Sequence, residues 1–513
     1  MSAASGGSFD YVVVGAGSGG SVVARRLVDA GASVAVVEAG GAPVEPAIHD
    51  PGRWAELPGS PVDWGYETEP QRACAGRRLA WPRGRVLGGT SALNGLAHIR
   101  GHRLDYDGWA YHGARGWGFD DVLPLFKRSE DCDLGPSEYR GAGGPLPVTT
   151  RYPRHPLIEA MVAASQEAGI PYNPDHNGAE LDGVGYSQLT MRGGVRATAW
   201  SAFLEPVAGR SNLTALTGSA ARRLRFAGGR CTGVEIERGG AVMVVEATDE
   251  VIVCAGAIDS PRLLLLSGLG PADELTALGI ECRADLPGVG KNLHDHLLCP
   301  VIVTSPRPVP DRVAGVTQLH AHLFWRSRPG LVVPDTQPLF FHLPLYRSED
   351  MTGPDDAYTL LGGLIRVESR GELRLVSADP DIRPSLDPRC LSCEADLDAL
   401  TASVELVREI ARQPALAEWT AEELYPGPSV RTRAELRDYV RRTVVSYHHQ
   451  VGTCRMGVDD RAVVDPELRV RGIEGLRVAD ASVMPFITSG NTNAPTLMIG
   501  EKASDLLLAA AAD

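Results

Sequence analysis

The chain has 513 residues, of which 43% are hydrophobic and 22% charged, and its net charge at pH 7 is -14. This length exceeds a single simple core and predicts more than one domain. The acidic balance excludes nucleic acid as a partner, because proteins that bind the phosphate backbone present a basic surface.

Signals for export, membrane insertion and metal binding are missing from the sequence. The first eight residues lack the cationic start and apolar core of a secretion signal, and no uncharged run reaches the roughly 20 residues of a membrane span. The nine cysteines are an odd number, which predicts reduced thiols and a cytoplasmic protein. Cys390 and Cys393 alone have C-x-x-C spacing, and His320, His322 and His342 fit an ordinary sheet face. We therefore expect no metal and no membrane span.

The first predicted elements are a strand, a glycine-rich turn, a helix and a second strand. Residues 11–14 are a β-branched run suited to a strand buried on both faces. Gly15, Gly17 and Gly20 complete G-x-G-x-x-G, an amphipathic helix follows, and residues 34–37 form the second strand. The glycines permit a tight turn, a close approach of pyrophosphate and close packing of helix on strand. The helix N-terminus offers free N–H groups and a positive dipole to phosphate. This order predicts a dinucleotide-binding unit.

Glu38 directly follows the second strand. A carboxylate at this position accepts hydrogen bonds from the adenosine ribose, and its charge repels a 2'-phosphate. NADP is therefore disfavoured, while these residues alone leave FAD and NAD equally open.

Four later stretches carry a family resemblance. They are PRGRVLGGTSALNG (82–95), GAIDSPRLLLLSGLG (256–270), LPGVGKNLHDH (286–296) and NTNAPTLMIGEKASD (491–505). The chain resembles the glucose-methanol-choline (GMC) family of FAD-dependent oxidoreductases over essentially its whole length. The resemblance implies an α/β fold, in which a Rossmann-like FAD-binding domain is joined to a discontinuous α+β substrate domain built on an antiparallel sheet. We assign residues 1–155, 205–296 and 445–513 to the FAD-binding domain, and residues 156–204 and 297–444 to the substrate domain.

The resemblance also implies the residues that hold FAD. The loop at 88–91 can bring its backbone close to a ring, and Asn94 offers both a donor and an acceptor to flavin heteroatoms. Leu93 stands where covalent members of the family carry histidine, so we expect non-covalent FAD. His98 stands near the expected flavin, where it either tunes the ring or, as we favour, packs as a structural histidine. The expected cofactor-binding residues are Gly15, Gly17, Ser18, Gly20, Glu38, Ala39, Arg85, Gly88, Gly89, Thr90, Asn94, Gly95, Ala97, Ala221, Asp480, Ala481, Asn491 and Thr492.

The candidate catalytic residues come from SYHHQVGTCRMG, residues 446–457. In an extended segment, His448 and His449 point to opposite faces, so at most one of them faces a given ligand. By resemblance, His449 is the base that takes the hydroxyl proton of an alcohol as hydride leaves for flavin N5. Asn493 is its predicted partner, which would steady the developing alkoxide. For His448, substrate contact and packing stay equally open.

The substrate is the least constrained prediction. Segments near residues 60, 144 and 180 resemble the pyridoxine oxidases of the family, which favours a primary alcohol on an aryl or heteroaryl ring. The chain departs from that subgroup at Asn493, where the subgroup carries histidine. Choline is disfavoured, because His448 stands where an aromatic ring would face a quaternary ammonium. The expected partners are a small-molecule alcohol and either O2 or another electron acceptor, and the alternative function is a flavin-dependent lyase or photodecarboxylase on the same fold.

Overall fold

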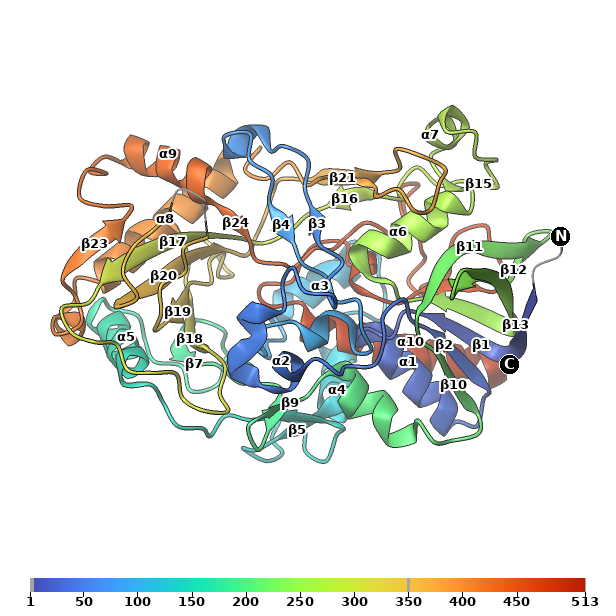
Figure 1. The fold of residues 1–513 in the computed structure, drawn as a ribbon, viewed down its shortest axis with the longest axis horizontal. Coiled ribbons are helices and arrows are strands. Elements are labelled where there is room, and N and C mark those ends of the chain that lie inside the picture. The colour runs from blue at the N-terminus through green and yellow to red at the C-terminus, as the bar shows by residue number, and fades with distance from the viewer. Residues whose placement is uncertain (1–3, 348–350, 513) are drawn as a thin grey trace.

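The computed structural model describes residues 4–347 and 351–512. Two large sheets lie toward opposite ends of the long axis of the molecule, and helices cover them (Figure 1). Residues 1–3, 348–350 and 513 of the predicted domains lie outside the described ranges. The α-helices of the described part are α1 (Ser18–Asp29), α2 (Pro46–His49), α3 (Arg103–Tyr111), α4 (Phe119–Ser129), α5 (Pro156–Glu167), α6 (Gly256–Leu266), α7 (Ala272–Ala277), α8 (Glu394–Ile410), α9 (Arg433–Thr443) and α10 (Asn493–Ala512).

The first sheet is mixed and has the strand order β10-β2-β1-β13-β12-β11, with β25 paired to β13. Its strands are β1 (Ala4–Val14), β2 (Val34–Val37), β10 (Leu213–Leu216), β11 (Ser219–Ala227), β12 (Arg230–Arg238), β13 (Ala241–Val253) and β25 (Leu476–Val478). The strands β10, β2, β1, β13 and β25 run parallel, and Val14 is level with both Val37 and Val253. The segments that follow these strands therefore meet along one edge, which is where a parallel sheet binds nucleotides.

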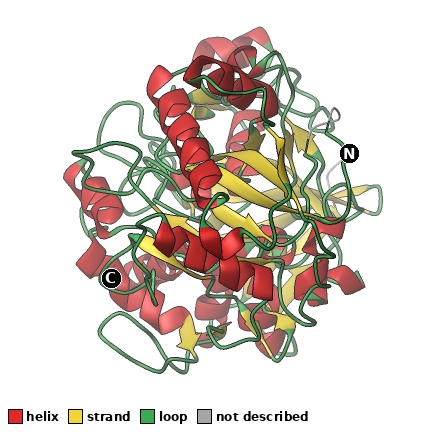
Figure 2. Cartoon of the chain, turned by 90° about the vertical axis from the view of Figure 1, so that its left-hand side faces the viewer, coloured by secondary structure: helices red, strands yellow, loops and turns green. Residues whose placement is uncertain are grey.

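The second sheet is antiparallel throughout, with the order β23-β17-β20-β19-β18-β7 and β24 paired to β17. Its strands are β7 (Gly183–Tyr186), β17 (Leu297–Thr304), β18 (Leu319–Phe324), β19 (Leu339–Phe341), β20 (Ala357–Leu364), β23 (Glu422–Tyr425) and β24 (Val445–Ser446). The helices α5, α8 and α9 cover its outer face, and Figure 2 shows helices in front of strands from that side. The remaining strands form small ladders: β3 (Tyr66–Glu67), β4 (Ala80–Trp81), β5 (Glu130–Cys132), β6 (Leu146–Val148), β8 (Met191–Arg192), β9 (Val195–Arg196), β14 (Leu269–Gly270), β15 (Ala284–Asp285), β16 (Lys291–Leu293), β21 (Gly371–Arg374) and β22 (Ser385–Asp387).

Alternation along the antiparallel strands gives the second sheet two apolar faces. In β19, Phe340 packs into the core beneath the helices, whereas Leu339 and Phe341 belong to a separate apolar cluster on the opposite face. Leu360 and Leu361 of β20 divide in the same way. Because successive side chains point to opposite faces of a strand, one face packs on helices and the other is left to line a cavity.

The predicted fold class is confirmed: an α/β nucleotide-binding part is joined to a part built on an antiparallel sheet. The domain boundaries stay predictions, and one detail bears on them, because β24 pairs with the antiparallel sheet although residues 445–513 were assigned to the FAD-binding domain. The strand β19 ends at Phe341, ahead of Pro344, which has no N–H for a ladder. Within the described part of the chain, no helix combines the length and apolar character needed to cross a membrane.

Candidate active site

One large cavity runs from the carboxyl edge of the parallel strands to the free face of the antiparallel sheet. Its volume is about 1260 Å³, and its walls come from both halves of the chain. The predicted residues that line it are Gly15, Gly17, Ser18, Glu38, Ala39, Arg85, Gly89, Thr90, Asn94, Gly95, Ala97, Ala221, His448, His449, Asp480, Ala481, Asn491, Thr492 and Asn493. Gly20 and Gly88 are not among the lining residues.

The glycine turn between β1 and α1 fits a pyrophosphate. Gly15 has φ +103°, and a Cβ there would lie 2.5 Å from the carbonyl oxygen of Cys254. Gly20 does not line the cavity but allows close packing. A Cβ at Gly20 would lie 1.9 Å from the Gly15 carbonyl oxygen, so the lack of a side chain lets α1 pack on β1. Gly17 caps α1 and lines the cavity, so the free N–H groups of the first helical turn face the space that a phosphate needs.

Glu38 follows β2 and is almost fully buried. Its Oε2 accepts a hydrogen bond from the Ala16 N–H at 3.0 Å, and its Oε1 accepts one from the Gly40 N–H at 2.8 Å. Burial raises the pKa of the carboxyl to about 7, although both backbone hydrogen bonds oppose this shift. The side chain therefore ties the glycine turn to the end of β2 while it lines the cavity.

Asp480 follows β25 on the same edge. Its Oδ2 accepts from the Gly256 N–H at 2.8 Å and from the Ser260 hydroxyl at 2.5 Å, and its Oδ1 accepts from the Ser482 N–H at 2.8 Å. The carboxylate is thus used to join the start of α6 to the segment after β25. This arrangement holds Ala481 and the N-terminal turn of α6 at the cavity wall.

A strap at residues 380–383 covers the nucleotide end of the cavity, and sequence reasoning missed it. Arg222 forms an ion pair with Asp381, and Arg383 donates to the Trp64 carbonyl oxygen at 2.8 Å. These contacts join segments that are far apart in the chain, and no local pattern in the strap predicts them.

His449 lies at the other end of the cavity, against the antiparallel sheet. Its Nε2 is 3.2 Å from Nδ2 of Asn491, its Nδ1 is 3.0 Å from Nδ1 of His296, and its ring stacks on Tyr447 with 4.5 Å between centroids. Burial lowers the pKa of His449 well below its ordinary value, and the imidazoles of His296 and His448 add to this effect. The ring is therefore neutral at pH 7 and able to accept a proton.

The structure corrects the prediction for the partner of His449. Asn493, the first residue of α10, turns away to the glycine turn, where its Oδ1 accepts from the Ser18 hydroxyl at 2.6 Å. Asn491, predicted only as a cofactor contact, is the carboxamide beside His449. Its Oδ1 also accepts from Nε2 of Gln337 at 3.1 Å, which fixes the orientation of the amide.

Asp295 fixes the backbone that carries the histidines. Its carboxylate accepts from the His449 N–H at 2.7 Å, from Gln450 Nε2 at 2.8 Å and from the Ser446 hydroxyl at 2.5 Å. Burial raises the pKa of Asp295 to about 6, against the effect of these hydrogen bonds. No local pattern around Asp295 predicts this connection to residues 446–450, which lie about 150 positions further along the chain.

His448 lines the cavity on a strained backbone. Its φ is +67°, a left-handed conformation that is uncommon for residues other than glycine. Arg83 donates to its carbonyl oxygen at 2.5 Å, and the Ser446 hydroxyl accepts from its N–H at 2.8 Å. Within the described residues its buried Nδ1 has no hydrogen-bond partner, so a donor or acceptor at that point of the cavity wall stays available.

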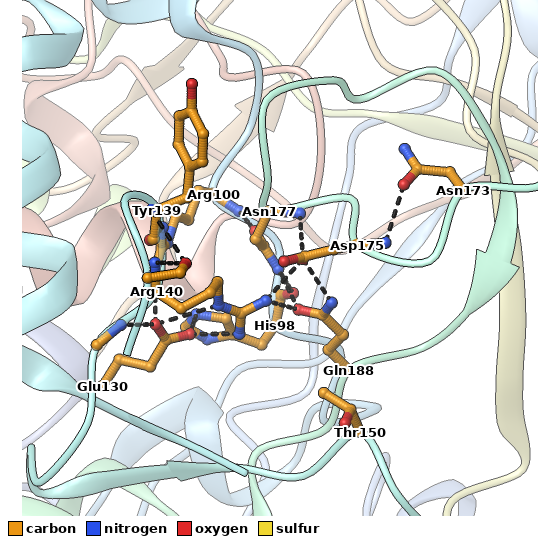
Figure 3. Close-up of polar contacts among 12 residues, drawn as sticks. His98, Arg100, Glu130, Tyr139, Arg140, Thr150, Asn173, Asp175, Asn177 and Gln188 are labelled. Carbon is orange, nitrogen blue, oxygen red and sulfur yellow. Dashed lines mark hydrogen bonds and ion pairs between the residues drawn. The ribbon is translucent and has the colours of Figure 1, made fainter. Parts of the chain in front are cut away.

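His98 points away from the cavity into a buried polar network (Figure 3). Its Nε2 is 3.5 Å from Oε1 of Glu130, which also pairs with Arg100 at 2.6 Å and Arg140 at 2.5 Å. Arg140 extends the network to Asp175 at 2.7 Å. Of the two interpretations left open for His98, the geometry matches a packed structural histidine. His98 directly follows Ala97, which lines the cavity.

Several other buried histidines pack on one another. His320 and His342 are edge to face with 5.7 Å between centroids, and His322 packs on His176 at 4.8 Å. Among the residues that the structure describes, no group of three or more histidine, cysteine or carboxylate side chains is arranged to hold a metal ion.

The chamber beside His449 is apolar on its sheet side. The side chains that residues 297–347 and 351–361 direct into the cavity are Leu298, Leu319, Leu339, Phe341, Leu345, Arg347 and Leu361. Trp54 joins them, 6.4 Å from Phe341 between ring centroids, and the Arg347 guanidinium lies over the Trp54 ring at 5.8 Å. Arg347 is thus the one charged side chain in this set of described residues.

A glycine turn that fits a dinucleotide and a neutral histidine across the same cavity indicate an oxidoreductase with a dinucleotide cofactor. The chain belongs to the GMC oxidoreductase family, whose models match residues 9–298 and 367–500. It is accordingly an FAD-dependent enzyme that oxidises the CH–OH group of an alcohol.

Three relatives illustrate the range of the family around this chain. Human mitochondrial choline dehydrogenase (Homo sapiens) is 41% identical over 97% of this chain and 89% of its own length. An oxygen-dependent choline dehydrogenase of Sinorhizobium medicae is 40% identical, over 97% of this chain and 95% of its own. The crystal structure of pyridoxine 4-oxidase from Mesorbium loti superposes with a TM-score of 0.92 at 38% identity, covering 97% of this chain and 98% of that one.

Proposed function

We propose that this enzyme oxidises an uncharged primary alcohol with an aryl or heteroaryl body to the aldehyde, with His449 as the base. The observation that carries the proposal is a neutral imidazole whose Nε2 faces the cavity beside an amide donor, opposite an apolar wall. When bound, FAD would supply a hydride acceptor. Gly15, Gly17 and the N-terminus of α1 would hold its pyrophosphate, and Gly89, Thr90 and Asn94 would lie along its ring.

His449 and Asn491 have different roles toward the hydroxyl group of the substrate. An alcohol releases hydride readily only as its oxygen loses the proton, so Nε2 of His449 takes that proton while the C–H bond breaks. The Asn491 N–H stabilises the negative charge that develops on the oxygen. Tyr447 and Asp295 keep the imidazole in place, since one stacks on the ring and the other holds its backbone N–H. Together they orient the carbinol carbon toward the flavin end of the cavity.

The chamber favours a flat apolar substrate over a quaternary ammonium. Trp54 and Phe341 offer ring surfaces to an aryl group. A trimethylammonium group is recognised by carboxylates and aromatic faces. The charged side chain that residues 297–347 and 351–361 contribute to the chamber wall is the cationic Arg347, which would repel a trimethylammonium group, whereas Asp63 and Glu67 line the cavity from an earlier segment. The choline dehydrogenases among the relatives therefore share the chemistry proposed here, while the apolar wall supports a neutral ring-bearing alcohol such as the substrate named for pyridoxine 4-oxidase.

FAD is proposed to be held without a covalent bond, and reduced enzyme to react with O2 or another acceptor. The non-covalent proposal is supported by Leu93, which lines the cavity where covalent members of the family carry histidine. Acid precipitation of the purified enzyme tests it, because non-covalent FAD leaves with the supernatant. A yellow pellet would contradict it.

Anaerobic mixing of the FAD-loaded enzyme with alcohols tests the function. Pyridoxine and benzyl alcohols are expected to bleach the flavin absorbance, and choline to do so at least tenfold more slowly at equal concentration. His449→Gln is expected to keep FAD and to slow bleaching by about 10²- to 10⁴-fold, the contribution of a positioned base. A lyase or photodecarboxylase would show no net bleaching by any alcohol. Readmission of air then distinguishes an oxidase from a dehydrogenase.

A further inference from the structure

His296 makes a direct contact with the proposed base. Its Nδ1 lies 3.0 Å from Nδ1 of His449, and the two rings meet at 89° with 5.2 Å between centroids. A hydrogen bond between two imidazole nitrogens requires that one of them carries the proton and the other accepts it. The contact therefore has two arrangements. One leaves Nε2 of His449 with a free lone pair, and the other places a proton on it.

The surroundings of His296 select one arrangement. Burial lowers its pKa to about 3, so the ring is neutral and carries a single N–H. The backbone carbonyls of Ile365 and Thr488 face the ring, and a carbonyl oxygen only accepts hydrogen bonds. Because Nδ1 is directed at His449, the nitrogen left for these carbonyls is Nε2, which is buried and makes no hydrogen bond of normal geometry in the described part of the chain. A proton on Nε2 attracts the carbonyl dipoles, whereas a bare Nε2 would repel them.

The contacts on the Nε2 side of His449 favour the same arrangement of protons. With its proton on Nε2, His296 accepts at Nδ1, so His449 donates from Nδ1 and keeps a lone pair on Nε2. At that lone pair stands the amide N–H of Asn491, whose Oδ1 is already engaged by Gln337 Nε2 at 3.1 Å. If the side-chain amides of Asn491 and Gln337 were both rotated by 180°, Asn491 would present its oxygen to His449, whose Nε2 would then have to carry the proton. His449 would accept at Nδ1 from His296, which would leave His296 Nε2 unprotonated and facing two carbonyl oxygens.

We propose that His296 is a positioning residue that holds His449 in the tautomer whose Nε2 accepts the hydroxyl proton of the substrate. The inference rests on the function proposed above and assigns the proton-accepting role of His449 to its Nε2 atom. As the O–H proton of the alcohol moves to Nε2, His449 becomes an imidazolium, and its Nδ1–H bond to His296 becomes charge-assisted and stronger. No bond at His296 forms or breaks. The wrong tautomer would have to release its proton before it could act.

Three substitutions at His296 distinguish the effect of a hydrogen-bond acceptor from the effect of side-chain shape. His296→Leu fills the site without an acceptor, His296→Asn places a neutral carbonyl oxygen near the position of Nδ1, and His296→Asp places an anion there. His294→Leu is the matched control, because His294 is as buried and lies two residues away, and bonds Asn292 and Ile487 instead of His449. All variants are compared as FAD-loaded enzymes by anaerobic flavin reduction across pH.

Only the acceptor at position 296 is expected to matter for the rate. His296→Leu should slow reduction by about 10²- to 10⁴-fold, the range for losing a correctly held base. His296→Asn should stay within about tenfold of wild type because it keeps an acceptor, and the control within about threefold because His294 bonds Asn292 and Ile487 and not His449. His296→Asp should raise the pH at which the base titrates, because an anion at Nδ1 favours the imidazolium over the opposing effects of His448 and Arg83. Equal rates for the Leu and Asn variants, or an unshifted profile for Asp, would overturn the inference.

Nitrogen NMR of histidine-labelled enzyme provides a readout that does not depend on turnover. A ring nitrogen that carries a proton resonates apart from a bare one, and His449→Gln and His296→Asn assign the signals. The proposal expects His449 protonated on Nδ1 in the wild type and a mixture of tautomers in His296→Leu. A wild-type signal for a proton on Nε2 of His449 would refute it. If His449→Gln itself reduces flavin normally, the proposed function fails, whereas a slow His449→Gln with a fast His296→Leu removes only this inference.

Discussion

The two asparagines of the NTN segment give the sharpest test of the site. Asn491→Ala removes the N–H that lies 3.2 Å from His449 Nε2 and the acceptor for Gln337 Nε2 at 3.1 Å. Loss of one donor to a developing oxyanion typically costs 10²- to 10³-fold in rate, or about 2.7–4 kcal/mol. Asn493→Ala instead removes the acceptor of the Ser18 hydroxyl, 2.6 Å away at the start of α1. One neutral hydrogen bond at the phosphate end is worth about 1 kcal/mol, which predicts roughly fivefold weaker FAD retention.

Stopped-flow reduction of FAD-loaded enzyme separates these two effects. We expect Asn491→Ala to reduce its flavin about 10²-fold more slowly with unchanged FAD content. Asn493→Ala should reduce its remaining flavin at the wild-type rate and release FAD more readily on dilution. The reasoning is refuted if Asn493→Ala shows the slow reduction while Asn491→Ala reacts normally, because the hydroxyl group would then be held at the α1 end of the cavity.

Three further predictions concern cofactor retention and stability. Glu38→Ala should raise the FAD dissociation constant about tenfold, because two backbone hydrogen bonds that shape the phosphate turn are lost; titration of apoprotein with FAD checks this, and equal occupancy would contradict it. Glu130→Leu should lower the free energy of unfolding by about 3–5 kcal/mol in denaturant titration, since Arg100 and Arg140 are left buried without their carboxylate. Burial lowers the pKa of His320 from 6.5 to about 4, so the unfolded chain binds the proton first as pH falls. The associated stability is complete above pH 6.5 and about 2 kcal/mol smaller at pH 5, and His320→Phe should flatten this part of the profile of melting temperature against pH.

Local patterns were enough to predict the strand, glycine turn and helix at the nucleotide end of the cavity. The run at 11–14, the three glycines and Glu38 are close in sequence, and each has a backbone reason to be where it is. Gly15 adopts a positive φ, and Gly20 leaves no space for a Cβ. Such features depend on neighbouring residues, so the sequence alone is enough to expect them.

The partner of His449 depended on where a helix begins, which the sequence left open. Asn491 and Asn493 have the same side chain and stand two residues apart, and α10 starts at Asn493. In the structure, that start directs Asn493 to the N-terminus of α1, whereas Asn491 precedes the helix and reaches across to the antiparallel sheet. A helix boundary is predictable from sequence only to within one or two residues, so a pattern with two identical side chains two residues apart gives no choice between them.

Long-range contacts account for the remaining misses. His296 and His449 meet only because the segment after β16 runs beside the segment after β24, where His294 and Val451 form a bridge. His98 was ambiguous because its partners, Glu130 and Arg140, come from other elements that converge on it (Figure 3). Neither contact produces a local sequence pattern from which it could be predicted.

We expect substrate choice to depend on the few residues that line the chamber and not on the sequence identity of the whole chain. Human choline dehydrogenase and pyridoxine 4-oxidase match this chain at 41% and 38% identity, so whole-chain identity does not separate their two substrates. The chamber wall comes instead from alternate positions of the antiparallel strands, such as Leu339 and Phe341, whose neighbours face the helices. A change at these positions alters the chamber without altering the fold, because the other face of each strand carries the packing. Under the proposed function, Phe341→Glu should favour choline relative to benzyl alcohol in anaerobic flavin reduction, and His449→Gln in that background should still slow the reaction with either alcohol.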